Sequence, residues 1–257
     1  MFCPRMGPAS VEIPLPGAHS TMPKTVGIIG GIGPESTIDY YRLIIATYRE
    51  QKPDGSYPSI IINSIDLKKM LDLIEANELA KVTEHLVREL QKLARAGADC
   101  GLLAANTPHI VFDEIRSQSP IPLVSIVEAT CETAKALGLK RLGLFGTRFT
   151  MQGRFYPDAF SRQGITLAIP EPEEQAYIHD KYMSELVKGI FLPETRARLL
   201  AIVDRLKERE GIQGLILGGT ELPLLFRDET SPYATTRIPF LDTTQIHVKA
   251  AVAQLLS

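Results

Sequence analysis

Short apolar runs alternate with longer amphipathic stretches over most of this chain. The runs lie at 26–29, 59–62, 101–103 and 122–126, and again at 141–145, 165–169, 214–217 and 239–241. Continuous runs of this length are typical of parallel strands that are buried on both faces. Between two of them, Leu79, Leu86 and Leu93 share one face of a predicted helix that ends at Gly97. The pattern therefore predicts an α/β fold in which helices cover parallel sheets.

The strand pattern starts again near residue 141, which indicates an internal duplication. Val26 and Leu142 are 116 residues apart, and Leu103 and Leu217 are 114 residues apart. Similar separations between corresponding strands are typical of a repeated unit. We expect two similar doubly wound α/β halves, each with a parallel four-stranded sheet, related by a pseudo-twofold axis. Since ligands bind beyond the carboxyl ends of parallel strands, an active-site cleft is expected between the halves.

The predicted domains follow from these repeats. Residues 25–122 together with 237–257 form the first α/β domain, because the final helix is expected to return to the first half, and residues 123–236 form the second. Residues 1–24 contain five prolines and no apolar segment of the signal-peptide type. They predict a disordered N-terminal extension, or an upstream start with Met22 as the natural beginning.

Composition restricts the classes of partner. A net charge of -2 gives no broad positive field, so we expect no nucleic-acid partner. No apolar run approaches the roughly 20 residues that span a bilayer, so no membrane partner is expected either. The three cysteines are widely spaced and predict reduced thiols in a cytoplasmic protein. No cysteine or histidine pair has the spacing of metal ligands, so we predict no metal site.

A glycine-rich turn, Gly30-Gly31-Ile32-Gly33, precedes Pro34 at the start of a predicted helix. Amide N–H groups at such a place bind anions such as phosphate or carboxylate. A dinucleotide fingerprint is a poor match, because Ser36 replaces the third glycine and Asp66 follows later than the roughly 20 residues expected. We therefore expect no nucleotide cofactor. A tight turn without a ligand is the alternative.

Two loops that follow apolar runs carry the groups most suited to a carboxylate. Asn106 and Thr107 offer an amide and a hydroxyl, and Thr220 and Glu221 offer a hydroxyl and a carboxyl group. With the segments 30–34, 63–66 and 146–151, these loops resemble those of the cofactor-independent aspartate/glutamate racemases. The resemblance extends from about residue 25 to the C-terminus and is closest to the branch that acts on both amino acids.

The resemblance implies a specific chemistry, and the chain departs from it at two positions. The family usually carries one cysteine in each loop, and the two thiols remove and return the Cα proton on opposite faces. Here these positions hold Ala105 and Gly219. Cys100 precedes Ala105 by an extended distance of about 16 Å and should point to the other face of the strand. The resemblance implies no cofactor, hence no pyridoxal phosphate (PLP), and a homodimer.

The resemblance and the residue types together predict the site residues. The expected catalytic groups are Glu221, His109, Thr107 and Thr220, with Asp66 also available. The expected substrate-binding residues are Gly31, Thr37, Ser64, Asn106, Thr107, Thr147, Thr220 and Lys188. Two of these have equally simple alternatives: His109 as a cap of the following helix, and Lys188 as a solvated lysine at a helix end.

The resemblance implies an amino-acid racemase-family isomerase that acts on an acidic amino acid or a related small-molecule carboxylate. It would transfer the Cα proton without PLP, by a thiol-independent or impaired route. One alternative is a related carbanion or enolate reaction, by a decarboxylase, lyase or isomerase, on a bulkier substrate, since two small residues should enlarge the cleft. Others are a non-catalytic carboxylate-binding protein and an engineered chain without its thiols.

Overall fold

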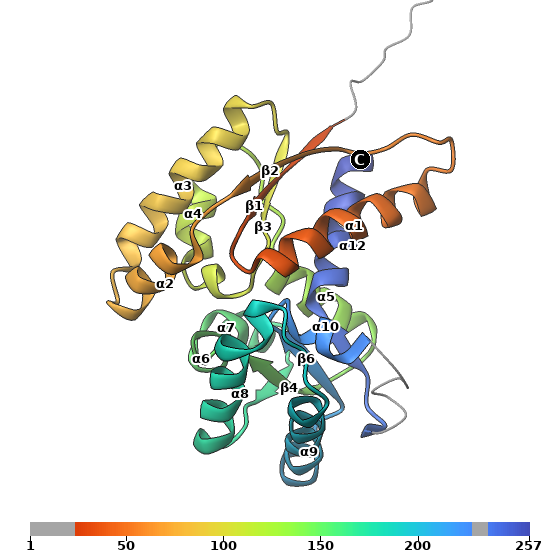
Figure 1. Ribbon diagram of the computed structural model, residues 1–257. Coiled ribbons are helices and arrows are strands. Elements are labelled where there is room, and N and C mark those ends of the chain that lie inside the picture. The colour runs from red at the N-terminus through yellow and green to blue at the C-terminus, as the bar shows by residue number, and fades with distance from the viewer. Residues whose placement is uncertain (1–23, 228–235) are drawn as a thin grey trace, which may run out of the picture.

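The computed structural model of the protein describes residues 24–227 and 236–257 (Figure 1). The protein has two parallel β-sheets with helices around them, so the predicted α/β fold with two parallel sheets is confirmed. Of the predicted extension 1–24, all but Lys24 lies outside the described residues. In the two described ranges, no helix is both long and apolar enough to cross a membrane.

The first sheet has the strand order β2-β1-β3, and β1 pairs in parallel with both neighbours. Helix α3 buries its apolar face against this sheet, where Leu86, Leu90 and Leu93 join a core with Ile29 and Leu103. The elements of this part are β1 (Thr25–Gly30), α1 (Pro34–Gln51), β2 (Ser59–Ser64), α2 (Leu67–Glu75), α3 (Leu79–Arg95), β3 (Cys100–Leu103), η1 (Thr107–Val111), α4 (Phe112–Gln118) and α5 (Ile126–Ala136).

The second sheet has the order β5-β4-β6-β7, again with all neighbours parallel. In both sheets the first strand lies between the second and the third, as the predicted duplication requires. The elements of this part are β4 (Arg141–Gly146), α6 (Arg148–Gln152), α7 (Phe155–Ser161), β5 (Thr166–Ala168), α8 (Pro172–Ser184), η2 (Leu186–Lys188), α9 (Pro193–Glu210), β6 (Gly214–Gly218), α10 (Leu222–Arg227), β7 (Phe240–Asp242) and α12 (Thr243–Leu256).

The first sheet has three strands where the sequence predicts four. The segment 122–126 contributes only an isolated parallel bridge between Leu123 and Gly101. Pro122 has no N–H to donate to a ladder, and the Ser125 hydroxyl accepts the Glu128 N–H at 3.3 Å and so caps α5 directly afterwards. A proline at one end and a helix cap at the other leave too short a segment for a regular strand.

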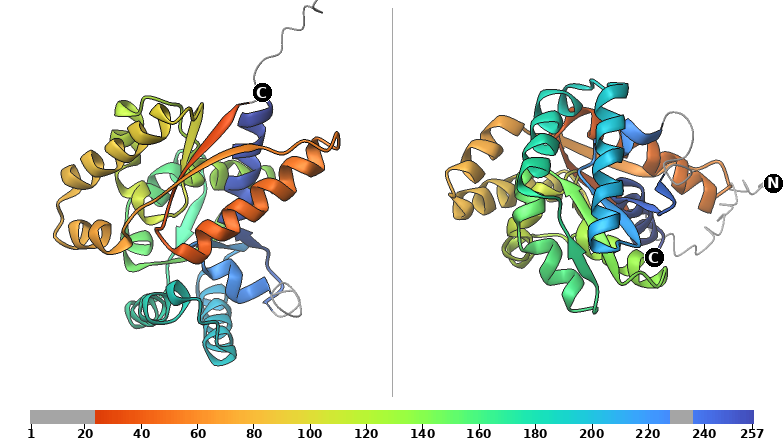
Figure 2. Two further views of the ribbon diagram at one scale, coloured as in Figure 1. Left: turned by 45° about the horizontal axis from the view of Figure 1, so that its top comes forward. Right: turned by 90° about the horizontal axis from the view of Figure 1, so that it is seen from below.

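Helix α12 joins the two halves. It packs against α1 of the first half and α5, and Figure 2 shows it beside α1. The His247 ring is fixed between two elements, because Nε2 donates to the Val124 carbonyl at 3.0 Å and Nδ1 accepts the Tyr40 hydroxyl at 2.7 Å. Strand β7, which directly precedes α12, pairs with β6 in the second sheet. The domain limits at 122 and 236 stay a prediction.

Candidate active site

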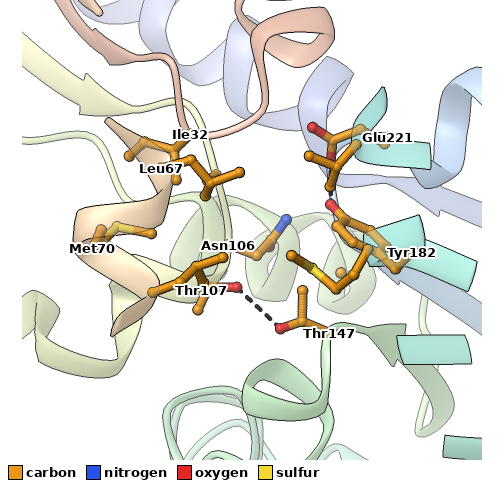
Figure 3. Close-up of a pocket in the computed structure, with 14 residues that line it drawn as sticks. Ile32, Leu67, Met70, Asn106, Thr107, Thr147, Tyr182 and Glu221 are labelled. Carbon is orange, nitrogen blue, oxygen red and sulfur yellow. Dashed lines mark hydrogen bonds between the residues drawn. The ribbon is translucent and has the colours of Figure 1, made fainter. Parts of the chain in front are cut away.

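A cavity of about 30 Å³ lies between the two halves, where the loops that follow β1, β3, β4 and β6 meet (Figure 3). This volume holds on the order of one water molecule. The first half contributes Ile32, Leu67, Met70, Leu71, Ala105, Asn106 and Thr107, and the second contributes Thr147, Tyr182, Met183, Val187, Gly218, Gly219 and Glu221. The cavity therefore lies at the carboxyl ends of both sheets, in the cleft that the strand pattern predicts.

Glu221 is the buried acid of this cavity. Its side chain is 1% exposed, and its Oε2 accepts hydrogen bonds from the Tyr182 hydroxyl and from Thr220 Oγ1, the latter at 3.1 Å. Its Oε1 has no hydrogen-bond partner among the described residues. Burial raises the pKa of Glu221 to about 7, although the hydrogen bonds from Tyr182 and Thr220 act in the opposite direction. A carboxyl group with such a pKa can both accept and return a proton near neutral pH.

At two glycines, a side chain of the site lies in the space that a Cβ atom would occupy. Gly33 has a φ of +102°, and a Cβ atom there would lie 1.9 Å from Glu221 Oε1. At Gly219, a Cβ atom would lie 2.4 Å from Cε2 of Tyr182. The expectation that Gly219 enlarges the cleft is therefore wrong, because the Tyr182 ring occupies the space that a side chain at residue 219 would need.

Tyr182 is the main site residue that the sequence analysis missed. Burial, followed by the Glu221 carboxylate, raises the pKa of Tyr182 well above its ordinary value, so the phenol stays protonated and donates to Glu221. Tyr182 lies near the end of α8, in no recognisable motif, and is 39 residues from Glu221. Only its contacts with Gly219 and Glu221, in the loop after β6, distinguish it from Tyr177 on the same helix.

Hydroxyl and amide groups from both halves form another part of the wall. Thr107 Oγ1 and Thr147 Oγ1 lie 3.1 Å apart and share a hydrogen bond across the cleft (Figure 3). Asn106 is held in place, because its Oδ1 accepts the Tyr156 hydroxyl at 2.7 Å and its Nδ2 donates to Thr243 Oγ1 at 3.3 Å. An amide has two N–H groups, so the one that this bond leaves can donate to a ligand in the cavity.

Several predicted binding residues do not line the cavity. Thr37 Oγ1 accepts the Gly31 N–H at 2.9 Å and donates to the Gly33 carbonyl at 3.2 Å, so it holds the glycine-rich turn together. Ser64 and Lys188 are exposed, and the lining residue next to Lys188 is Val187. The Asp66 carboxylate accepts the Lys68 N–H at 2.9 Å and caps α2. The structure brings together Asn106, Thr107, Thr147, Thr220 and Glu221 from the predicted set.

His109 lies behind the wall of the cavity and does not line it. The ring is 2% exposed, stacks on Phe112 with 4.5 Å between centroids, and accepts the Ile126 N–H at Nε2 with a distance of 3.3 Å. Burial, and then the nearby His247, lower the pKa of His109 to about 3, so the ring is neutral. This contact is with Ile126, the first residue of α5, and not with α4, the helix that directly follows His109.

The positions that the resemblance assigns to the thiols, Ala105 and Gly219, both line the cavity. Cys100 and Cys131 are buried elsewhere, in β3 and α5, and neither lines it. Within the described part of the chain, no group of three or more histidine, cysteine, aspartate or glutamate side chains is arranged to hold a metal ion. Glu221 and Tyr182 are the titratable side chains among the described lining residues.

Two similar parallel sheets, with strand-ending loops that enclose a buried acid, define an α/β protein whose site lies between two related halves. The Asp/Glu/Hydantoin racemase family matches residues 29–251, and the chain belongs to this family. The chain is therefore a member of an enzyme family whose relatives include amino-acid racemases.

Individual relatives match along most of the chain. The broad specificity amino-acid racemase RacX of Bacillus subtilis (strain 168) is 24% identical over 242 residues, 90% of this chain and 98% of that protein. The structure of PH1733, an aspartate racemase homologue from Pyrococcus horikoshii OT3, is 33% identical with a TM-score of 0.76, over 92% of this chain and all of that one. The aspartate racemase of Picrophilus torridus, at 21% identity and a TM-score of 0.70, covers 90% of this chain and 94% of its own, and shows the same fold.

Proposed function

We propose that this protein is a PLP-independent isomerase of the family, which transfers the Cα proton of an amino acid or a related carboxylate without thiols. The observation that carries the proposal is the environment of the Glu221 carboxyl group. Its carboxyl group lies in the cavity beside Gly219, has a pKa raised to about 7, and keeps one oxygen without a partner among the described residues. In this proposal Glu221 is the proton acceptor, and Tyr182 holds its other oxygen.

The proposed step uses groups on two sides of the cavity. Ionised Glu221 takes the Cα proton at Oε1, and the electron pair of the broken C–H bond moves onto the substrate's carboxylate oxygens. The donors available for that developing charge are the Asn106 amide and one of the two hydroxyls of Thr107 and Thr147, since the other hydroxyl donates within that pair. The proton then returns to Cα from the Glu221 carboxyl group or from solvent.

The titratable groups of the cavity lie on one side of it. Figure 3 places Tyr182 and Glu221 together, across the cavity from Ile32, Leu67 and Met70. Since none of these three side chains carries an exchangeable proton, return of a proton to the opposite face of Cα depends on solvent. We therefore expect hydrogen exchange at Cα to be faster than inversion of configuration.

Other parts of the proposal rest on the family and on the lining residues. No lysine lines the cavity in the described ranges, and a lysine is what holds PLP as a Schiff base, which supports a PLP-free reaction. The relative RacX is named a broad specificity amino-acid racemase, which supports a small amino-acid substrate. An acidic side chain on the substrate, a cytoplasmic location and a homodimer remain predictions of the sequence resemblance.

A decarboxylase is the second candidate, and the apolar wall opposite Glu221 favours it. A carboxylate held against Ile32, Leu67 and Met70 would be destabilised, and loss of CO₂ relieves that burial. The resulting carbanion needs only one proton donor, protonated Glu221. The two candidates differ in their pH dependence. Proton abstraction needs ionised Glu221 and becomes faster as the pH rises through about 7, whereas decarboxylation becomes slower.

The decisive experiment is deuterium incorporation at Cα in D₂O, followed by mass spectrometry and chiral separation over a panel of D- and L-amino acids. We expect exchange by the natural chain and a loss of at least about 100-fold in Glu221→Gln, as is typical for removal of a general base. Glu132→Gln, at an exposed position of α5, is the matched control and should exchange normally. Exchange that survives in Glu221→Gln would overturn the assignment of Glu221.

A further inference from the structure

Apart from Glu221, Tyr182 and the neutral donors, the larger side chains that line the cavity are apolar. They come from the glycine-rich turn, from α2, and from the end of α8 with η2: Ile32, Leu67, Met70, Leu71, Met183 and Val187. No lysine, arginine or histidine lines the cavity in the described ranges, and Lys188 is exposed. A ligand in this cavity therefore meets one acidic group, a few neutral donors and hydrocarbon or thioether side chains.

The neutral donors suffice for one carboxylate. Thr107, Thr147 and the Asn106 amide come from adjoining loops and are the described neutral donors around the cavity, apart from Tyr182 and backbone amides. A second carboxylate, on the substrate's side chain, would have to lie against the apolar wall without a cation. An unpaired charge in such surroundings is strongly disfavoured. The Glu221 carboxylate, when ionised, would repel it as well.

We infer that the substrate is a monocarboxylate, an amino acid whose side chain is apolar and packs against α2 and Met183. This inference rests on the proposed function, since it assumes that the cavity binds the substrate of the proton transfer. It departs from the acidic substrate that the sequence resemblance implies. The residues that decide specificity are then Leu67, Met70, Leu71 and Met183.

Entry of such a side chain requires the wall to move, because about 30 Å³ is far less than an amino acid occupies. Met70 and Met183 are unbranched and can change rotamers at little cost. Met183 also lines a neighbouring cavity of about 290 Å³, which Arg148, His179 and Asp180 line as well. Displacement of Met183 would connect the two cavities. The competing possibility is therefore a substrate whose acidic side chain reaches Arg148.

Binding and exchange together test the inference. Isothermal titration calorimetry with D- and L-methionine, leucine, phenylalanine, aspartate and glutamate measures affinity without turnover, and deuterium exchange measures the reaction. We expect the apolar amino acids to bind at least about tenfold more tightly than the acidic ones, because an unpaired charge is poorly tolerated in the cavity. The same order is expected for kcat/KM of exchange.

Engineered cations provide the converse test. Leu71→Arg, and separately Leu67→Lys, should shift the preference toward aspartate and glutamate by about tenfold or more, since they supply the missing counter-charge. Leu71→Gln is the matched control, polar but uncharged, and should weaken apolar ligands without a gain for acidic ones. Two half-buried positions are used so that a folding defect in one variant does not decide the result, and circular dichroism checks both.

Each outcome has a defined meaning. Tighter binding of aspartate or glutamate by the natural chain overturns the inference, and loss of that preference in Arg148→Ala would identify the competing route. Binding of apolar amino acids without Cα exchange overturns the proposed function and leaves the inference about the ligand standing. Absence of binding by every amino acid in the panel overturns both.

Discussion

At the scale of single residues, a hydrogen-bonded pair of side chains lies beside residue 219, the position to which the resemblance assigns a thiol. Tyr182 and Glu221 hydrogen bond to each other, and the Tyr182 ring lies over Gly219. The Tyr182 ring therefore depends on Gly219, because a Cβ atom at residue 219 would collide with it. The Glu221 carboxyl group in turn depends on Tyr182, whose hydroxyl donates a hydrogen bond to it. Because burial holds the Glu221 pKa near 7, the acid is poised to exchange protons where a free glutamate would be fully ionised.

The first prediction concerns the pH dependence of exchange. Since ionised Glu221 is the proposed base, the rate should rise with pH through about 7 and level off above it. The Tyr182 hydrogen bond lowers the Glu221 pKa, so Tyr182→Phe should move this limb to higher pH. Measurement of kcat/KM for deuterium exchange from about pH 5 to about pH 9 tests the natural chain and Tyr182→Phe. An unchanged limb in Tyr182→Phe would contradict the assigned hydrogen bond.

The second prediction is that Gly219→Ala destabilises the fold by about 1–3 kcal/mol, as overpacking of a core does. The added Cβ atom would lie 2.4 Å from Cε2 of Tyr182. In a Tyr182→Ala background the same substitution should have little effect, which a double-mutant cycle of urea unfolding measures. Additive effects of the two substitutions would show that the ring and residue 219 do not compete for space. Gly219→Cys, which restores a thiol, should meet the same obstruction.

At the scale of elements, the position of α12 is set by polar contacts as well as by packing. The His247 ring bonds to α1 through the Tyr40 hydroxyl and to the segment before α5 through the Val124 carbonyl. The side chains of Tyr40 and His247 are fully buried. A buried ring that bonds at both nitrogens fixes the rotation and the axial position of its helix, since loss of either bond leaves an unsatisfied polar atom.

The third prediction is that Tyr40→Phe lowers the free energy of unfolding by about 1–3 kcal/mol, because His247 Nδ1 loses its donor in a dry environment. Tyr41→Phe is the matched control on the same helix, since Tyr41 is 46% exposed, and should change stability by less than about 0.5 kcal/mol. Urea unfolding followed by circular dichroism measures both variants. Equal effects of the two substitutions would contradict the role given to the His247 contact.

At the scale of the whole molecule, buried titratable groups at the junction of the halves link stability to pH. Burial lowers the pKa of His109 to about 3 and that of His247 to about 4, whereas it raises that of Glu221 to about 7. Between about pH 4.5 and 6.5 the unfolded chain protonates both histidines and the folded chain does not, so stability is lost as the pH falls. Glu221 acts oppositely in this window, since its folded state holds the extra proton.

The fourth prediction follows from these opposing signs. Each histidine contributes up to about 1.4 kcal/mol per pH unit to the slope of stability against pH, and Glu221 removes a similar amount. The natural chain should therefore lose stability on acidification. His109→Gln should flatten this slope, and Glu221→Gln should make it steeper. Urea unfolding at several pH values between about 4.5 and 6.5 measures the slopes, and a change of the same sign in both variants would contradict the assignment.

Much of the architecture could be predicted because it depends on local periodicity. The apolar runs at 26–29 and 214–217 form β1 and β6, and the predicted face of Leu86 and Leu93 is the buried face of α3. The prediction of a regular strand at 122–126 was wrong, because the apolar pattern gives no sign that Ser125 caps the next helix. The apolar pattern alone identifies buried segments, whereas strand pairing depends on the neighbouring strands and the contacts that they provide.

By itself, the sequence determined the two parallel sheets and the loops at their carboxyl ends, since burial of apolar runs and chain turns are local consequences of residue order. Asn106, Thr107, Thr147, Thr220 and Glu221 come together for that reason. The tertiary structure alone decided that Tyr182 reaches Glu221, that His109 faces α5, and that the Glu221 pKa lies near 7. Contacts between distant segments, and the exclusion of water that shifts a pKa, arise only when the elements pack together.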